Sequence, residues 1–528
     1  VSLPKMNYLE KIPNSAKTMM VIPTIVKDKK KMLKMFKKLE QFYLVNNSKN
    51  LYFALMVDAS EEKSKTTSFD DEICNYGLEL CKELNKKYKQ NLFYFVYRNY
   101  NKSMHSYLGY ERKRGALIDF NKLLLHQYTN EQKEKYFKVE TISSLNEKIK
   151  YVITLDADTD LVLNTAIHLI GAMDHPLNKP IYNEEKTKII KGYGMMQPRI
   201  SMDIESTNKS IYSQTFAGVG GFSVYNSTVS DFYQDYFHEG NFVGKGIYNL
   251  EAFDTILSNL FPENLILSHD MIEGIFLRCA LASDIEFIDD FPASYQVDTT
   301  RQARWARGDT QILGYLKSKI KAGNKWIKNP IDSIGKFRIF DNIRRMFLYL
   351  AFVLLLVLNT CLSKNLYFTI LFLLFVLLLP TLLSWAERIH IQIKPTNRKQ
   401  KYKYHENIMY GNKAVAIRSF ISFITIPYTC YLYLKSFFTS VYRMLISKQN
   451  LLSWLTAEDA EKKAKNTLST YFKKFIANYI CVIVLLVVTL LTDPSFFLLP
   501  TLFSLSFLIA PFVLNYVSKT KTKKEEIN

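Results

Sequence analysis

The chain has 528 residues, too many for one hydrophobic core, so we expect two or more domains. Its 69 lysine and arginine residues against 49 acidic residues give a net charge of +20, which favours a nucleic acid or an anionic membrane surface as partner. The sequence has no zinc-finger or RNA-binding motif, but it has long apolar stretches after residue 315, which decide for the membrane and against nucleic acid.

The cysteines and the first residues bear on the compartment. None of the six cysteines stands in a CxxC pair, so no disulfide framework is expected, which fits a reducing compartment for the soluble part. Residues 1–17 are polar and interrupted by Pro4 and Pro13, a pattern unlike a signal peptide. Because the first residue is Val1 and not methionine, we expect the chain to be a piece of a longer polypeptide.

The first hundred residues alternate between strand and helix patterns. Strands are predicted at residues 18–23, 51–58 and 91–97, and helices at residues 27–44 and 70–88. Such an alternation predicts a mainly parallel sheet with right-handed crossovers.

A fourth predicted strand, residues 151–155, ends in the acidic pair Asp156 and Asp158. Open α/β sheets bind ligands at the carboxyl ends of their strands, and two carboxylates at this spacing can hold a divalent cation that grips a diphosphate. Asp58 also ends a strand, so we expect Asp58 and Asp156 at neighbouring strand ends, facing one cleft. The alternative for a lone Asp-x-Asp is a strand that runs into an acidic turn. The charged residues 130–150 are expected to form an insertion loop.

Two basic motifs could face that cleft. Lys113 and Arg114 lie at the predicted start of a helix, where positive charge opposes the macrodipole, so we expect them to grip phosphate or uracil. A protein–protein surface is the alternative. Lys245 and Gly246 belong to a Gly-Lys-Gly loop in which the lysine could donate to hydroxyls or phosphate and the glycines could let the backbone approach a sugar. An ordinary turn is the alternative there.

Asp270, in Ser268-His269-Asp270, is the candidate general base. A sugar transfer that inverts the anomeric carbon needs one carboxylate beside the acceptor hydroxyl, although an Asp before a helix is more often an N-cap.

Residues 301–309 hold three arginines around Trp305. Arginine can neutralise a diphosphate in a bidentate manner and tryptophan can stack on a sugar ring, whereas the alternative is a solvated charged face.

The composition becomes leucine-rich and nearly uncharged in the second half of the chain. Four stretches are about long enough to cross roughly 30 Å of hydrocarbon as helices. They are residues 346–362, 366–385, 475–491 and 496–517.

Residues 414–438 are also apolar, but they contain Arg418, Pro427 and Lys435 and have basic segments on both sides. The positive-inside rule places both flanks in the cytoplasm, so we predict an interfacial segment on the inner leaflet. The resulting prediction is a cytoplasmic domain at residues 1–330 and a membrane region at residues 331–528.

The order of these motifs resembles the processive inverting glycosyltransferases of the cellulose-synthase type, whose motifs read D, DxD, TED and QxxRW. Here Ser268-His269-Asp270 stands in place of TED, and Arg301 stands at the glutamine of QxxRW with Gln302 beside it. These two departures argue against a cellulose, chitin or hyaluronan synthase.

A narrower family fits better, because several strings look like the glycosyltransferase domain of cyclic β-1,2-glucan synthases. LLSWLTAEDAE is similar to that family too, whereas residues 221–225 (GFSVY) lack the Asp-Pro expected there. The strings that carry the resemblance are YLGYERKRGALIDFN, YVITLDADTDL, AMDHPLNKP, GYGMMQPRIS, SDFYQDYFHEGNFVGKGIYN, FPENLILSHDMIEGIF and RQARWARGDTQIL.

The resemblance implies a GT-A-like, mixed and mainly parallel Rossmann-like sheet followed by a transmembrane α-helical region. It implies UDP-glucose as donor, Mg²⁺ or Mn²⁺ as cofactor, and transfer to a β-1,2-glucan at the inner (cytoplasmic) membrane. The implied roles are uracil or ribose binding for Asp58, metal and diphosphate binding for Asp156 and Asp158, the general base for Asp270, diphosphate and acceptor binding for Gln302, Arg304 and Trp305, and acceptor binding for Lys245 and Gly246.

The family is also thought to grow its glucan on a tyrosine of its own chain. Tyr100 is the candidate, with Tyr97 and Tyr107 as rivals. Larger members add a phosphorylase-like region and a cyclising activity, so this chain alone is expected to elongate but not to cyclise. The alternatives are a synthase of another β-glucan or polysaccharide, and an inactive scaffold for partner domains.

Overall fold

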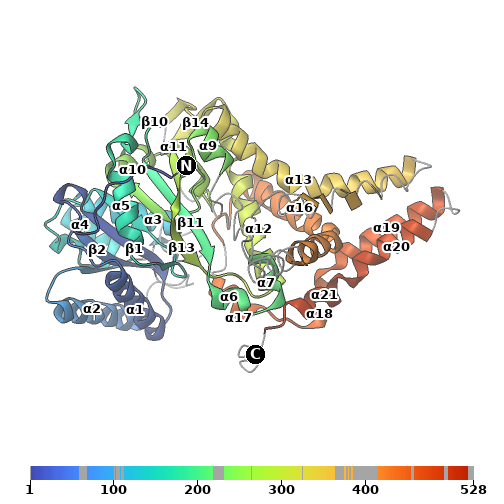
Figure 1. The fold of residues 1–528 in the computed structure, drawn as a ribbon, viewed down its shortest axis with the longest axis horizontal. Helices are drawn as coiled ribbons and strands as arrows, with labels where there is room; N and C mark the ends of the chain where they lie inside the picture. Colours follow the sequence, from blue (N-terminus) through green and yellow to red (C-terminus); the bar gives the residue numbers. More distant parts are fainter. Residues whose placement is uncertain are drawn as a thin grey trace, which may run out of the picture.

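The computed structural model combines a β-sheet domain with an elongated arm of helices (Figure 1). It describes residues 2–58, 68–99, 101–102, 107–108, 112–217, 231–262, 265–323, 325–362, 371, 374–375, 378–379, 382–383, 413–453, 457–492 and 498–520.

The sheet domain is built on nine strands in the order β6-β3-β2-β1-β7-β12-β11-β13-β8. Strands β1, β2, β3, β7, β11 and β13 run in one direction, whereas β6, β8 and β12 oppose them. The predicted α/β fold with a mainly parallel sheet is therefore confirmed. The strands are β1 (Thr18–Ile25), β2 (Leu51–Asp58), β3 (Phe93–Arg98), β6 (Phe137–Glu140), β7 (Tyr151–Thr154), β8 (Asp160–Leu161), β11 (Met195–Met202), β12 (Gly246–Asn249) and β13 (Cys279–Asp289).

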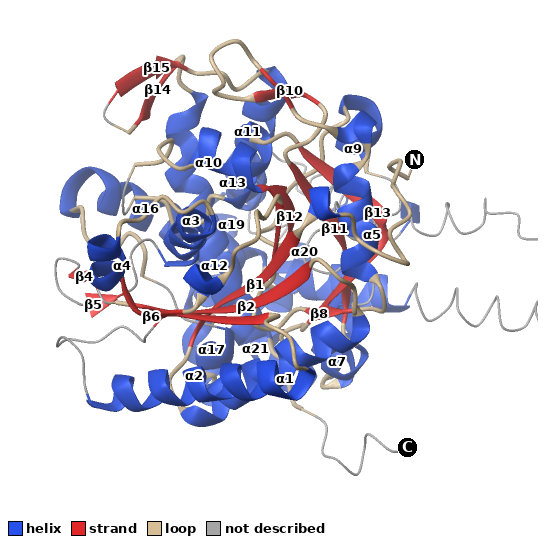
Figure 2. Ribbon diagram, turned by 90° about the vertical axis from the view of Figure 1, so that its left-hand side faces the viewer, coloured by secondary structure: helices blue, strands red, loops and turns tan. Residues whose placement is uncertain are grey.

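Helices cover both faces of this sheet (Figure 2). Alternate residues of β1 enter two separate cores: Met19 and Val21 enter one, and Met20 and Ile22 the other. The first core also contains buried residues of α3 (Arg112–Leu124), α10 (Leu250–Leu257) and α11 (Asp270–Phe276), and the second contains residues of α1 (Lys29–Val45), α2 (Ser68–Tyr88) and α5 (Thr165–Asp174).

Two predictions about this domain were wrong. Residues 130–150 are not a plain loop, because α4 (Asn130–Tyr136) and the edge strand β6 lie there, and Thr129 and Gln132 form a capping box at the start of α4. Asp58 and Asp156 are not at neighbouring strand ends, since β1 pairs with both β2 and β7 and lies between them.

The helical arm packs against the sheet domain through α12 (Tyr295–Gln311). Tyr295 of α12 stacks on Phe475 with ring centroids 5.9 Å apart, inside a third hydrophobic core shared by both parts. Figure 1 shows α12 between the sheet and the arm. The arm contains α13 (Ser333–Leu362), α16 (Ile426–Tyr442), α18 (Leu468–Lys474), α19 (Ile476–Thr492), α20 (Leu498–Leu505) and α21 (Ala510–Val517).

Within the described residues, no single helix is both long and apolar enough to cross a membrane. Two bent helix pairs would suffice by length and composition: Lys413–Ile424 with Ile426–Ser447, bent by 66°, and Leu468–Lys474 with Ile476–Leu491, bent by 53°. The described helices thus give only weak support to the predicted membrane region.

Some of the four predicted membrane spans correspond to helices of the arm and others do not. Residues 346–362 form the second half of α13, and residues 475–491 correspond to α19. Residues 496–517 are not one helix, because α20 and α21 are separated by a 3-10 turn. Most of residues 366–385 lies outside the described residues. The predicted interfacial segment, residues 414–438, falls within the first bent pair.

Candidate active site

The Asp156-Ala157-Asp158 motif forms a tight turn directly after β7. The Thr159 amide donates to the Asp156 carbonyl at 3.2 Å, and Lys38 of α1 donates to the Ala157 carbonyl at 3.0 Å. These bonds fix the backbone from which Asp156 and Asp158 project. The Asp156 side chain remains 34% exposed, so its carboxylate is accessible to a ligand.

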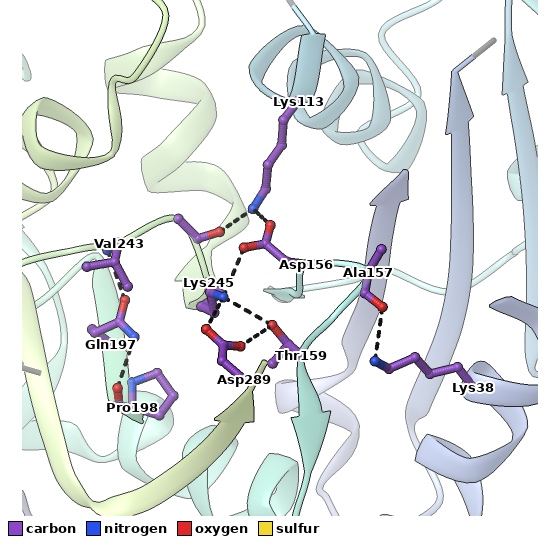
Figure 3. A network of polar contacts seen from close by, with 11 residues as sticks. Lys38, Lys113, Asp156, Ala157, Thr159, Gln197, Pro198, Val243, Lys245 and Asp289 are labelled. Atoms are coloured by element: carbon purple, nitrogen blue, oxygen red, sulfur yellow. Dashed lines mark hydrogen bonds and ion pairs between the residues drawn. The ribbon is translucent and has the colours of Figure 1, made fainter. Parts of the chain in front are cut away.

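Two lysine ammonium groups flank the Asp156 carboxylate (Figure 3). Lys113, from the first turn of α3, donates to Oδ1, and Lys245 lies 3.0 Å from Oδ2. Burial alone would raise the pKa of Asp156, but the two ammonium groups more than offset this and lower its pKa. Asp156 therefore stays ionised.

The Gly-Lys-Gly loop connects this carboxylate with Asp270. Gly244 has φ +90°, and its carbonyl accepts from Lys113 at 2.6 Å. A Cβ added to Gly244 would lie 3.0 Å from Asp270 Oδ1, so this backbone runs directly against that carboxylate. A Cβ on Gly246 would meet the Met196 carbonyl at 2.2 Å, so glycine there allows β12 to approach β11.

Asp270 is the first residue of α11 and is not its N-cap, a position that His269 occupies without a side-chain bond. Burial raises the pKa of Asp270 above its usual value. The Nδ1 atom of His269 lies 3.2 Å from Glu273 Oε1 without a directed hydrogen bond. Atoms of His269, Asp270 and Glu273 that could bind a proton or a metal ion lie within 4.8 Å of one another.

Some polar side chains of the arginine-rich helix α12 bind residues of the same helix, and another is influenced by the carboxylates of the site. Arg301 and Gln302 both bind Asp298, at 2.7 Å each, and the Arg301 guanidinium lies 4.9 Å from the centroid of the Trp305 ring. Arg304 is different, because the Asp156 and Asp270 carboxylates across the site act on its charge. Burial lowers the pKa of Arg304, whereas these carboxylates raise it.

Two other predicted donor-binding residues, Asp58 and Arg114, have partners outside the acidic turn. Both carboxylate oxygens of Asp58 accept from Arg98 at 2.6 Å, and Asp58 is only 7% exposed. Arg98 also binds the carbonyl of Arg112 at 3.0 Å, so Asp58 acts on the backbone that carries Lys113. The buried Arg114 guanidinium lies 5.0 Å from the centroid of the Phe261 ring.

Our reading of the sequence missed Asp289 and Thr159, which complete the site. Lys245 donates to Asp289 Oδ2 and to Thr159 Oγ1, and Thr159 donates to Asp289 Oδ1 at 2.8 Å. Asp289 ends β13, which runs parallel to β11, in the same pattern as Asp58 and Asp156. An acidic residue at a strand end was therefore a signal that could have found it. The signal for Thr159 was its place next to Asp158.

The candidate acceptor tyrosine, Tyr100, lies outside the described residues, and so does the 221–225 segment. Its rival Tyr97 is buried in β3 with 1% exposure. The backbone of Tyr107 forms the short strand β5 (Tyr107–Leu108).

The residues present fit a divalent cation. Carboxylates such as Asp156 and Asp158 are the hard oxygen ligands that Mg²⁺ and Mn²⁺ prefer. Asp156 is partly exposed, and the Lys113 side chain on its Oδ1 is long and 29% exposed, so it can move aside. The metal would be held by Asp156 and Asp158.

A mainly parallel α/β sheet with an acidic turn at one strand end, cations around it and a separate carboxylate is typical of sugar-nucleotide glycosyltransferases. Cyclic beta-(1,2)-glucan synthase NdvB from Rhizobium meliloti (strain 1021) is 28% identical over an alignment of 529 residues that covers 98% of this chain. This likeness confirms the resemblance predicted from the motifs. The chain spans 18% of the length of that relative. No protein-family model matches the chain.

Proposed function

We propose that the chain is a membrane-bound inverting glucosyltransferase that transfers glucose from UDP-glucose to a growing β-1,2-glucan. The carrying observation is the joint geometry of Asp156, Lys113, Gly244 and Asp270: one loop touches both the acidic turn and the candidate base. The name of the relative supports the product, because the similarity to that protein extends over 98% of this chain.

In the proposed reaction Asp270 removes the proton from the acceptor hydroxyl. The acceptor oxygen then bonds to the anomeric carbon as the bond from that carbon to the diphosphate breaks, and UDP leaves with the electron pair. Lys113 and Arg304 balance the negative charge that develops on the diphosphate. A bound Mg²⁺ or Mn²⁺ ion would supply further neutralisation of that leaving group.

The partners follow from this proposal: UDP-glucose, a glucan acceptor, and phosphorylase-like and cyclising domains of a longer polypeptide. The acceptor is linked to a tyrosine of the chain itself, with Tyr100 as the candidate. If mass spectrometry still finds glucose attached in a Tyr100→Phe protein, Tyr100 is not the acceptor.

We place the sheet domain in the cytoplasm and the arm in the inner membrane, divided near residue 330. Large apolar side chains on the surface of the arm support this, since such surfaces are rarely left to water. Leu358, Ile483 and Leu491 are examples, with Leu491 80% exposed.

The deciding experiment incubates membranes that hold this chain with radiolabelled UDP-glucose and Mg²⁺ or Mn²⁺, followed by a denaturing gel and linkage analysis. We expect label on the protein and 1,2-linked glucose. A metal-free sample and an Asp158→Asn protein should both lose most incorporation, whereas Asp284→Asn, whose partly exposed side chain pairs with Lys5 at the surface, should not.

Other results would change the assignment. A different linkage, or incorporation from another sugar nucleotide, would indicate a synthase of another polysaccharide. Failure with every donor would favour an inactive scaffold. We expect a linear product, which weighs one water more than the cyclic glucan of equal length, so a cyclic product from this chain alone would contradict the prediction that it only elongates.

A further inference from the structure

Each of the two Asp156 oxygens faces an ammonium group, and the two lysines are held in different ways (Figure 3). A divalent cation that binds Asp156 would lie close to both ammonium groups, and the repulsion between these positive charges favours the departure of one of them. The surroundings of each lysine indicate which one leaves.

Lys245 is fixed on all sides. Its ammonium contacts Asp289 and Thr159 as well as Asp156, and only 7% of its side chain is exposed. Its backbone is also restrained, because the next residue, Gly246, pairs with β7.

Withdrawing Lys245 would take away the ammonium group that pairs with Asp289, a side chain with only 2% exposure. An uncompensated buried charge is strongly destabilising. We therefore expect the buried contacts with Asp289 and Thr159 to keep Lys245 beside Asp156.

Lys113 has a looser environment. Its ammonium contacts Asp156 and the Gly244 carbonyl, and 29% of the side chain is exposed. If it moves away, it leaves one carbonyl and one partly exposed carboxylate, both of which water or a ligand can satisfy.

We infer that Lys245 is a permanent counter-cation of Asp156 and that Lys113 is the exchangeable one, which a divalent cation displaces. Asp289 and Thr159 are positioning residues that hold Lys245 in place. One Asp156 oxygen and Asp158 then remain for the metal. This inference rests on the divalent-cation dependence in the proposed function.

The first test acylates lysines in the unaltered chain, with and without saturating Mn²⁺ and without nucleotide, and measures labelling by peptide mass spectrometry. Lys113 should be labelled more when Mn²⁺ is present, and Lys245 should stay protected in both samples. Exposure of Lys245 on Mn²⁺ addition, or labelling of Lys113 that ignores bound Mn²⁺, would overturn the inference.

The second test measures Mn²⁺ affinity by the electron paramagnetic resonance of the free ion. Lys245→Met should bind Mn²⁺ about tenfold more tightly, because the substitution uncovers oxygens of both Asp156 and Asp289, although glucose transfer falls. Lys209→Met is the matched control: it removes a positive charge that acts on the nearby Asp290, and its Mn²⁺ affinity should equal that of the unaltered chain. Equal or weaker Mn²⁺ binding by Lys245→Met would contradict the inference.

These readouts separate the inference from the proposed function. Glucose transfer is measured on the same preparation, so a protein that shows the expected lysine pattern but transfers no glucose would refute the function and leave the inference standing. A protein that transfers glucose but fails both lysine tests would refute the inference and leave the proposed function standing.

Discussion

At the scale of single residues, the site depends on charges that hold one another in place. Asp58 binds Arg98 through both oxygens, and Arg98 in turn binds Asp119 at 2.9 Å and the carbonyl of Arg112. The carbonyl that Arg98 binds belongs to Arg112, the residue directly before Lys113. Asp58 can therefore influence the site through the backbone, whether or not it contacts a nucleotide.

We expect Asp58→Asn to destabilise the fold by about 3 kcal/mol, because it removes one partner of a buried ion pair. Thermal and denaturant unfolding would measure this, and Asp284→Asn, on the surface, should stay within about 1 kcal/mol of the unaltered chain. An Asp58→Asn protein with unchanged stability and lost UDP-glucose affinity would instead indicate direct contact with the nucleotide.

Asp270→Asn should lower the transfer rate by about 10²–10⁴-fold while UDP-glucose and Mn²⁺ affinity stay nearly unchanged, because only the proton acceptor is removed. Burial raises the pKa of Asp270, so the acid limb of kcat/KM should lie above the usual pH of about 4, with activity rising as the carboxyl ionises. Rates across pH and binding by calorimetry test this. Loss of donor binding would mean that the role of Asp270 is a different one.

At the scale of elements, α12 ties the chemistry to the arm. On one side Arg304 interacts with Asp156 and Asp270, and on the other Arg307 donates to the Ser453 carbonyl at 2.8 Å. A single helix thus joins the acidic turn to the segment that follows α16.

The arginines of α12 should behave differently when replaced. Arg304→Lys should raise the KM for UDP-glucose about tenfold with a nearly unchanged melting temperature, since lysine cannot make the bidentate contact to phosphate that we propose for Arg304. Arg301→Lys should instead lower the melting temperature by several degrees, because it disturbs the buried contacts with Asp298 and Trp305. Steady-state kinetics and thermal unfolding of both proteins test this. A lower melting temperature for Arg304→Lys together with a higher KM for Arg301→Lys would contradict the two assignments.

The contact between α12 and α13 should depend on pH. Burial raises the pKa of Asp309, which accepts from Asn342 at 3.1 Å, to about 6. Because the folded state holds this proton more tightly than the unfolded state, the contribution of Asp309 favours folding below pH 4 and is lost as pH rises to about 6.

Asp309→Asn should therefore stabilise the protein at pH 7.5, by at most about 3 kcal/mol, and the gain should shrink towards pH 4. Unfolding curves at the two pH values measure the difference. A gain that is equal at both would show that ionisation of Asp309 is not its cause.

At the scale of the whole molecule, the sheet domain and the arm share a core and are joined end to end (Figure 1). Ser210 forms an isolated β-bridge with Thr520, and the Tyr295 amide donates to Ser518 Oγ at 3.2 Å. The C-terminal end of the arm thus returns to the sheet domain.

A chain cut at residue 330 should be poorly stable, because the cut uncovers Tyr212, Phe291 and Tyr295, which are buried against the arm. We expect it to aggregate, or to bind a dye for exposed apolar surface more strongly than the full chain. Dye fluorescence and size-exclusion chromatography test this. A soluble, cooperatively unfolding fragment would mean that the sheet domain is independent.

The sequence by itself determined the elements that depend on local pattern. Apolar runs such as residues 51–58 predicted β2 at its observed bounds, and the alternation of strands and helices predicted the mainly parallel sheet. The acidic turn and Asp270 could also be predicted, because local sequence patterns indicate where a strand ends and where a helix begins.

Tertiary structure alone decided which side chains meet. Nothing local shows that Arg98 would occupy both oxygens of Asp58, that Arg114 would turn towards Phe261 while Lys113 turns towards Asp156, or that Asp289 would hold Lys245. These partners are distant in sequence, and buried charges settle wherever the fold supplies opposite charge. Strand order is also a long-range property, which is why β1 separates Asp58 from Asp156.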